Sequence, residues 1–461
     1  MSSSPSTAPP LAMPLRVNLS IMMFLQFAIW GSWFVIFFPY LLKNGFTGTQ
    51  AGTLMGNMAL GAIFSTIFAG YIADRLMSSE RLMAICHLLG AALLYGIAQI
   101  HSADEYLTIY VLTLAYALLY NPTLVLANSI SFHHVPDGQR DFPGLRVFGT
   151  IGWIVAGLVI GRLFTGEDTT AANTNGPLLI AAGLSAVLGV YSLFLPHTPP
   201  KGQAEGIPIV KALGLFRDFS FAVFFIVSLA ITIVLAFYYV VTADFLGAPA
   251  AVGGCGVKDV TSLMTIGQVC EMIFLPILPL FLMRMGMKWV LVLGMFCWGL
   301  RYFLFAHAGA EGLGFTLALI GIVLHGFCFD FFFAAGFIHC DNEAPRDIRA
   351  SAQALFSFLT YGVGMWLGSM LAGSLKDSFT VQQSLTTTTL GDDPGKANAM
   401  AALGGAPTYA ATTPVTDWVH FWFAPSIGVL ACMVVFILFF QMKMGRQPTQ
   451  TEPAGETTPG V

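Results

Sequence analysis

This sequence has little charge. Only 10% of its 461 residues are Asp, Glu, Lys or Arg, whereas 56% are hydrophobic. A soluble domain carries about 25% charged residues, so this chain has too little polar surface to face water on all sides. Its formal net charge of -4 and the lack of a basic stripe argue against a nucleic-acid partner. The composition excludes an ordinary soluble domain and favours a membrane protein.

Motifs for metals, disulfides and catalysis are also missing. The seven Cys form no CxxC pair and no metal-ligand spacing, which is typical of small buried hydrophobic residues, so we expect neither a metal nor a cofactor. The absence of G-x-S-x-G and H-E-x-x-H motifs disfavours an enzyme. Residues 1–14 are rich in Ser and Pro and lack a basic start, so we expect no cleavable signal peptide.

Long apolar runs dominate the chain instead. A membrane-spanning helix needs about 20 apolar residues. Candidate spans lie near 17–40, 48–72, 81–100, 105–132, 146–165, 177–196, 219–243, 260–283, 288–308, 312–339, 350–375 and 417–441. The sequence therefore predicts an all-α membrane protein of about 12 transmembrane helices, with both termini on one side because the count is even.

Lys and Arg predict the orientation, because cytoplasmic loops of membrane proteins are enriched in them. With a cytoplasmic N-terminus, the inside segments carry Arg16, Arg75, Arg81, Arg140, Lys201, Lys211, Arg217, Arg284, Lys288, Arg346, Arg349, Lys443 and Arg446. The outside loops then carry only Lys43, Arg162, Lys258, Lys376 and Lys396. Both termini are predicted to be cytoplasmic.

The loop lengths predict two halves. We expect a cytoplasmic tail, a first six-helix half, a central cytoplasmic loop, a second six-helix half with one external loop rich in Thr, Ala and Gly, and a C-terminal tail. Their boundaries are 1–16, 17–196, 197–218, 219–441 with the loop at 377–416, and 442–461. Two six-helix halves around a central loop are typical of secondary transporters.

A short charged motif follows the second apolar run. Residues 70–75 (GYIADR) resemble the G-x-L-A-D-R loop of the major facilitator superfamily. Gly70, Asp74 and Arg75 match it, and Asp74 is placed at a membrane boundary where a carboxylate can pair with Arg75 or cap a helix. An ordinary charged loop is the alternative interpretation.

A narrower resemblance runs through about 17–375. Seven strings in order are similar to the bacterial nucleoside:proton symporters of that superfamily: 25–33 (LQFAIWGSW), 84–87 (AICH), 122–124 (PTL), 146–153 (RVFGTIGW), 195–197 (LPH), 328–332 (CFDFF) and 348–353 (IRASAQ). The resemblance implies a multi-pass protein of the bacterial inner (plasma) membrane whose partners are a nucleoside, a proton and the lipid bilayer. We expect a monomer.

Placing an ionisable side chain inside the membrane costs free energy, so such a residue usually has a functional role. Asp330 lies among phenylalanines, where it can load and release a proton, and the resemblance implies that Phe329 and Asp330 line the substrate site. Gln268 and Glu271 lie three residues apart on one helical face, and both match a Gln and a Glu of the family's binding site. Asp330 and Glu271 are the candidates for proton coupling. The alternatives are a structural carboxylate at Asp330 and a helix–helix hydrogen-bond pair at Gln268 and Glu271.

The fifth run supplies a further set. Arg146 is placed at its start, and Thr150 and Trp153 follow on the same face. The planar guanidinium group of arginine can donate hydrogen bonds to a substrate, and an aromatic ring can stack on a base or sugar. The resemblance carries Arg146 and Thr150 into the binding site, with Trp153 where the family has Phe. A lipid-headgroup anchor is the alternative for Arg146.

The seventh run departs from the family. The resemblance implies a binding Gln and Asn there, whereas this chain has Ala236 and Tyr239. Two amides are lost, and Tyr238 or Tyr239 can return only a hydroxyl. Among the other intramembrane residues, we expect Arg301 to form a structural ion pair and His325 and His339 to be packing histidines. His325 is the better candidate for a proton relay because it lies deeper in its run.

These patterns predict a proton-coupled nucleoside permease that works by alternating access, with no enzymatic activity. A proton-coupled permease for another small polar solute, such as a sugar or a nucleobase, is the second hypothesis, and the seventh-run departures motivate it. A solute sensor that transports nothing is the third.

Overall fold

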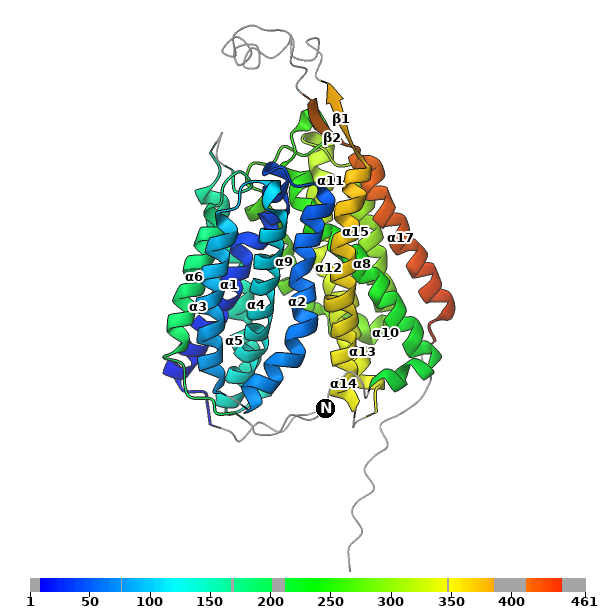
Figure 1. The fold of residues 1–461 in the computed structure, drawn as a ribbon. Helices are drawn as coiled ribbons and strands as arrows, with labels where there is room; N and C mark the ends of the chain where they lie inside the picture. Colours follow the sequence, from blue (N-terminus) through cyan, green and yellow to red (C-terminus); the bar gives the residue numbers. More distant parts are fainter. Residues whose placement is uncertain are drawn as a thin grey trace, which may run out of the picture.

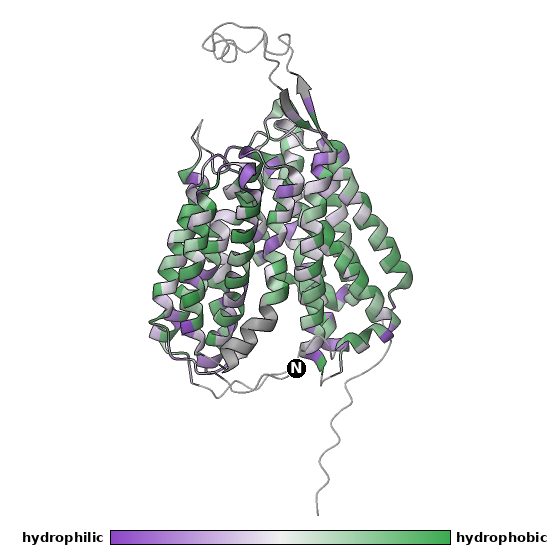
Figure 2. Ribbon diagram, viewed as in Figure 1, coloured by the Kyte–Doolittle hydropathy of each residue, from purple (hydrophilic) through white to green (hydrophobic). Residues whose placement is uncertain are grey.

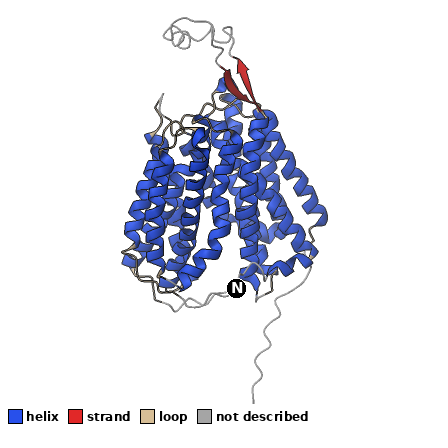
Figure 3. Ribbon diagram, in the orientation of Figure 1, coloured by secondary structure: helices blue, strands red, loops and turns tan. Residues whose placement is uncertain are grey.

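A computed structural model describes residues 9–75, 77–166, 170–200, 212–345, 348–384 and 412–441. Helices make up nearly all of this part of the chain, and one small antiparallel sheet projects from one end (Figure 3). Nine helical stretches in the described residues are long and apolar enough to cross a membrane. The all-α prediction is confirmed, and the count of twelve stays a prediction.

The N-terminal helices form the first group. They are α1 (Met13–Lys43), α2 (Gly48–Arg75), α3 (Ser79–Ala98), α4 (Tyr106–His134), α5 (Gly138–Leu163) and α6 (Gly176–Ser192), with the turn η1 (Ala103–Glu105) before α4. Within this group α1 packs on α5 and α6, and α3 packs on α4 and α6. We call α1 to α6 the N-terminal group.

The remaining elements form the C-terminal group. They are η2 (Leu213–Arg217), α8 (Phe219–Gly247), η3 (Ala250–Val252), α9 (Val260–Phe274), η4 (Leu275–Ile277), α10 (Leu278–Ala306), α11 (Gly312–Val323), α12 (His325–Phe329), η5 (Asp330–Ala334), α13 (Ala335–Glu343), α14 (Arg349–Ser357), η7 (Phe358–Gly364), α15 (Met365–Ser378), β1 (Thr380–Ser384), β2 (Thr412–Thr416) and α17 (Trp418–Phe439). The segments η5 and η7 are single stretches of π-helix inside longer helices. The two groups stand side by side (Figure 1).

Two boundaries have a clear local cause. The fifth helix begins at Gly138 rather than at 146, because the Asp137 carboxylate accepts hydrogen bonds from the backbone N–H groups of Gln139 and Arg140 and caps a polar first turn. The predicted break between 283 and 288 is found at Gly286, whose φ of 76° is not helical. Glycine adopts that conformation without steric cost.

The two ends of the predicted external loop at 377–416 are described by the structure. Its ends form strands β1 and β2, which pair antiparallel with Val381 opposite Val415. Residues 385–411 lie outside the described residues. The prediction of an exposed loop missed this pairing because the two strands are far apart in the sequence.

The outer faces of the helices are apolar. Hydrophobic residues cover both groups (Figure 2), and Leu107, Phe194 and Met283 keep more than 70% of their surface exposed. Large apolar side chains exposed in such numbers have no favourable contact with water, whereas lipid tails solvate them. This pattern is that of a multi-pass membrane protein.

Candidate substrate and proton site

Among the described residues, the two groups pack together mainly through α2 with α15, α5 with α9, α1 with α8, and α2 with η7. Glu271 of α9 lies where they meet. Its charge acts on Arg146 of α5 in the N-terminal group and on Asp330 and Tyr361 of the C-terminal group. Because these partners come from both groups, the exposed 29% of the Glu271 side chain is best explained by a position facing the space between them.

The two π-helical segments bring Asp330 and Tyr361 together. A π-helix inserts an extra residue into a turn and re-aims the side chains beside it, and such segments are frequent at functional sites. Asp330 opens η5, only 1% of its surface is exposed, and its Oδ2 atom has no hydrogen-bond partner in the described part of the chain. The Phe329 ring lies 6.4 Å from the ring of Tyr361 in η7. Phe329 and Asp330 therefore belong to the cluster that also contains Glu271.

Arg146 lies two turns inside α5 and not at its start. Its guanidinium carbon lies 4.2 Å from the ring centroid of Phe27 in α1. Gly149 makes room for this stack, because a Cβ atom there would lie 2.7 Å from both the Arg146 Nη1 atom and the Phe27 ring. The contact with Phe27 and the attraction to Glu271 favour a substrate role over a lipid-headgroup anchor.

Thr150 and Trp153 follow Arg146 on α5. Trp153 meets the ring of Trp30 edge-to-face at 5.3 Å, and Trp30 in turn contacts Tyr120 at 6.1 Å. Thr150 is half-buried beside this aromatic patch. A planar solute bound next to Arg146 would therefore have an aromatic wall from α1, α4 and α5.

The two residues of α8 that differ from the family pattern, Ala236 and Tyr239, lie in different surroundings. Ala236 is fully buried and packs against Gly368 of α15, where an added Cβ would lie 2.7 Å from that of Ala236. Tyr239 faces the cluster, since its ring lies 6.1 Å from that of His325 and its hydroxyl interacts electrostatically with Glu271. Gln268 stands one turn before Glu271 on α9, as expected from their spacing. Only Tyr239 of the two departures can change the site.

The prediction of an ion pair for Arg301 is wrong within the described residues. Arg301 is fully buried, its Nε–H donates to the Gly321 carbonyl at 2.8 Å, and its guanidinium stacks over Tyr238 and Trp298 at 4.1 and 4.9 Å. Aromatic faces attract a cation and replace the carboxylate that we expected.

The two histidines have different surroundings. His339 packs among rings, including Phe224 at 4.8 Å and Phe440 at 5.4 Å, as predicted for a packing histidine. His325 differs, because its Nε2 atom lies 4.0 Å from a carboxylate oxygen of Glu271.

The superfamily motif at 70–75 lies at the end of a helix rather than in a loop. Helix α2 continues through Arg75. The side chains of Gly70, Asp74 and Arg75 lie outside the described residues, so the predicted ion pair or cap at Asp74 stays a prediction.

Sequence reasoning missed a close contact at the other end of α2. Asp377 of α15 accepts hydrogen bonds at 2.7 Å from the backbone N–H groups of Gly48 and Thr49 and from the Thr49 hydroxyl. Helices α2 and α15 touch backbone to backbone here, since a Cβ atom on Gly373 would overlap the Gly48 carbonyl oxygen. The spacing of four in Gly48 and Gly52 and in Ser369 and Gly373 is the available signal, because small residues at that spacing let helices approach.

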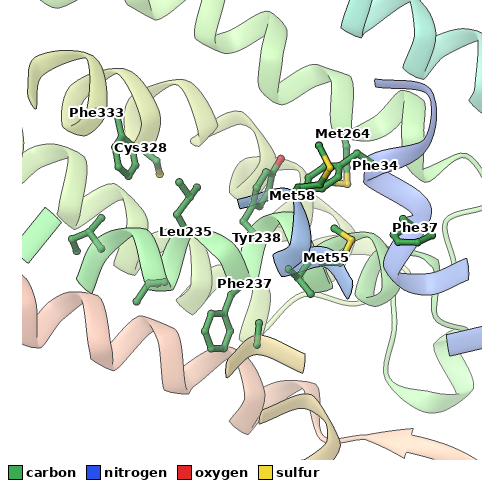
Figure 4. Close-up of a cluster of buried hydrophobic side chains, with 14 of the residues drawn as sticks. Phe34, Phe37, Met55, Met58, Leu235, Phe237, Tyr238, Met264, Cys328 and Phe333 are labelled. Atoms are coloured by element: carbon green, nitrogen blue, oxygen red, sulfur yellow. The ribbon is translucent and has the colours of Figure 1, made fainter. Parts of the chain in front are cut away.

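A buried apolar cluster contains side chains from both groups of helices. It includes Phe34 and Phe37 of α1, Met55 and Met58 of α2, and Met264 of α9 (Figure 4). A cavity of about 660 Å³ lies at the strand end of the molecule, lined in part by Lys43, Asp244 and Lys376. The two groups are therefore closed against each other at this end.

Comparison with known proteins places the chain in a family. The family model described as "Nucleoside H+ symporter" matches residues 13–445. The chain is 40% identical to the putative nucleoside transporter YegT of Escherichia coli over 80% of this chain and 87% of that protein. It is 33% identical to the xanthosine permease of E. coli over 80% of this chain and 90% of that protein.

A solved structure agrees with this assignment. The crystal structure of the nucleoside transporter NupG superposes with a TM-score of 0.79 at 29% identity and covers 94% of this chain and 100% of that one. Its fold is the major facilitator type that the motif at 70–75 suggested. With a family model that matches almost the whole chain and a relative at 40% identity, this chain belongs to the nucleoside H+ symporter family.

Proposed function

We propose that this chain carries nucleosides inward across a bacterial inner membrane together with protons, by alternating access of two six-helix halves. The observation that carries the proposal is the electrostatic interaction of Glu271 with both Arg146 and Asp330, since these residues come from both groups of helices and lie within apolar spans. Charged groups are tolerated at such depth when they serve substrate or proton movement. Membership in a transporter family also agrees with the expectation that the protein is not an enzyme.

The proposed topology has twelve spans, with halves at 17–196 and 219–441, a central loop at 197–218 and both tails in the cytoplasm. Two features support it. Lys and Arg concentrate on one set of loops. The start of α1 and the end of α17 also lie at the end of the molecule opposite to β1 and β2 (Figure 1). We further propose that the protein acts as a monomer in the bilayer.

Each site residue has a role in this proposal. Arg146, Thr150 and Gln268 bind polar groups of the nucleoside, and Trp153, Phe329 and Tyr239 provide rings against its base or sugar. Glu271 and Asp330 take up the proton. The motif residues Gly70, Asp74 and Arg75 act in the conformational change at the cytoplasmic end of α2.

In this proposal, the closure between α2 and α15 corresponds to one stage of the transport cycle. With the strand end closed and that end facing outward, substrate and proton exchange with the cytoplasm. Opening of the same contact gives access from outside, and the site between the groups serves both stages.

Uptake into proteoliposomes tests the function directly. Under an inward proton gradient, radiolabelled uridine or adenosine is expected to accumulate, and a protonophore is expected to abolish the accumulation. Liposomes without protein and liposomes without the gradient are the controls. Absence of gradient-driven nucleoside uptake would sink the proposal.

A second cargo is favoured by the departure at Tyr239, which offers a hydroxyl where the family has an amide. Sites built on hydrogen bonds discriminate strongly against solutes that leave their groups unpaired. Under this alternative the chain carries a nucleobase, a sugar or another small polar solute with the proton. Competition by unlabelled nucleosides, nucleobases and sugars against uridine uptake separates the two cargoes.

Arg146→Gln is expected to weaken substrate binding. A hydrogen bond from a charged group contributes about 1.5–3 kcal/mol, so KM should rise by roughly 10-fold to 100-fold. Initial uptake rates over a range of uridine concentrations measure this. Arg162→Gln, at the exposed outer end of the same helix, is the matched control. An unchanged KM in Arg146→Gln would remove Arg146 from the binding site.

A further inference from the structure

His325 of α12 lies fully buried beside Glu271 without a hydrogen bond in the described part of the chain. Neither ring nitrogen has a partner in the described part of the chain, and the side chain is fully buried. Buried polar atoms are almost always hydrogen-bonded in folded proteins. An imidazole in this position therefore calls for a partner that reaches it at another stage of the cycle. Glu271, with Oε2 at 4.0 Å from the His325 Nε2 atom, is the near candidate.

Three elements packed around His325 carry titratable groups. From α8, Tyr238 stacks on the imidazole at 4.9 Å and Tyr239 meets it edge-on at 6.1 Å. From α10, Arg301 lies over the Tyr238 ring at 4.1 Å and its charge acts on His325. From α9 comes Glu271.

The other neighbours add little charge. Helix α11 carries no titratable residue, and the span of His325 itself adds Cys328 and Asp330. The fixed positive charge of Arg301 opposes a second positive charge on the imidazole. His325 is therefore best suited to act as a neutral hydrogen-bond acceptor.

Glu271 thus has two kinds of neighbour. Arg146, in the N-terminal group, attracts the ionised carboxylate. A neutral Nε2 atom of His325, in the C-terminal group, accepts a hydrogen bond only from the protonated carboxyl group. A shift of about 1 Å would bring the present 4.0 Å separation to hydrogen-bond length.

We propose that His325 is the positioning residue that receives Glu271 in its protonated form. When Glu271 binds a proton, its carboxyl group loses the attraction to Arg146 and donates its new O–H to the Nε2 atom of His325. The only covalent bond formed is that O–H bond, and the proton comes from the aqueous side to which the site is open. Arg146 then has a free guanidinium to bind polar oxygens of the substrate.

This arrangement couples the two cargoes. An unprotonated carrier keeps Arg146 occupied by Glu271, so substrate binds weakly. A protonated carrier offers Arg146 to the substrate, so binding of the proton strengthens binding of the solute. Release of the proton to the cytoplasm restores the attraction between Glu271 and Arg146 and expels the substrate. The inference rests on the proposed function and assigns to it a residue that makes solute binding depend on the proton.

Binding of radiolabelled uridine and adenosine to the purified full-length protein, at acidic and at alkaline pH, tests the proposal. The wild type is expected to bind more tightly at acidic pH. His325→Phe keeps the ring stack on Tyr238 but has no acceptor, and should lose about tenfold in affinity at acidic pH with little change at alkaline pH, which flattens the pH profile. His325→Gln offers an acceptor oxygen and should restore most of the pH dependence. His339→Phe, a packing histidine of the same span, is the matched control and should behave as the wild type.

Two outcomes would overturn the role of His325. One is a pH profile of His325→Phe equal to that of the wild type. The other is a His325→Gln variant that melts at the wild-type temperature yet is as defective as His325→Phe, because the acceptor would then be irrelevant. A wild-type protein that neither binds nor transports nucleosides would instead refute the proposed function, so the two failures are distinguishable.

Discussion

Asp330→Asn should abolish proton-driven accumulation of nucleoside and leave exchange of internal for external nucleoside intact. Asparagine has the same shape as aspartate but takes up no proton in the physiological range. Asp330 is 1% exposed, and one of its carboxylate oxygens has no hydrogen-bond partner among the residues that the structure describes. Its charge state therefore matters to the energy of the buried cluster. A carrier that takes up no proton can still cross between its two states with nucleoside bound. Exchange of internal for external nucleoside should therefore persist.

The expected loss is large and easily measured. A gradient of one pH unit stores about 1.4 kcal/mol, which supports about tenfold accumulation by a carrier that moves one proton per solute. In the variant, internal and external uridine should reach equal concentrations under the same gradient. Asp104→Asn, on an exposed turn at η1, is the matched control and should accumulate normally. Retained accumulation in Asp330→Asn would exclude this residue from coupling and leave Glu271 as the sole carboxylate candidate.

Gly373→Leu should block transport by preventing closure of α2 on α15. A Cβ atom at Gly373 would overlap the Gly48 carbonyl oxygen and lie 3.0 Å from the Gly52 Cα atom. Backbone atoms cannot move aside as a flexible side chain does, so the two helices must separate. Separation also breaks the three hydrogen bonds of the Asp377 carboxylate to the start of α2. The protein should then be held open at its strand end, unable to release substrate on the other side.

Uptake and thiol labelling together test this prediction. Uptake by Gly373→Leu should fall to the level of empty liposomes. A cysteine introduced at Ala171, a buried residue that lines the outer cavity, should react faster with a bulky maleimide in the Gly373→Leu background. Gly183→Leu in α6 is the matched control, because a Cβ atom there meets nothing within 4 Å. Wild-type uptake by Gly373→Leu would mean that closure at this contact is not part of the cycle.

The sequence anticipated the helices well because their signal is local. Each span is a run of apolar residues, and lipid requires that its backbone hydrogen bonds be satisfied within the helix. The start of α5 was placed eight residues late, at 146 instead of Gly138, because the first turns of this helix are polar and hydropathy does not detect them. The cap at Asp137 was the missed signal.

The candidate site was anticipated only as a set of unconnected residues. Apolar context singled out Glu271 and Asp330, and family resemblance singled out Arg146, but no pattern in the chain states that their charges act on one another. The surroundings of Arg301 show what a sequence pattern fails to predict. A buried arginine predicts an ion pair by default, whereas the aromatic rings that surround this one come from α8 and from its own helix.

By itself, the sequence determined that this protein is helical and lies in a membrane. It also determined which ionisable side chains lie within the membrane-spanning helices. These properties depend on the composition of short continuous segments. Only the tertiary structure decided which of those side chains meet. The π-helical turns at Asp330 and Tyr361, the electrostatic interaction of Arg146 with Glu271 and the closure of Gly48 on Gly373 all depend on how distant helices pack. So does the lack of partners for the His325 nitrogens within the described residues. Packing is set by shape complementarity between faces hundreds of residues apart in the chain, and no local pattern records it.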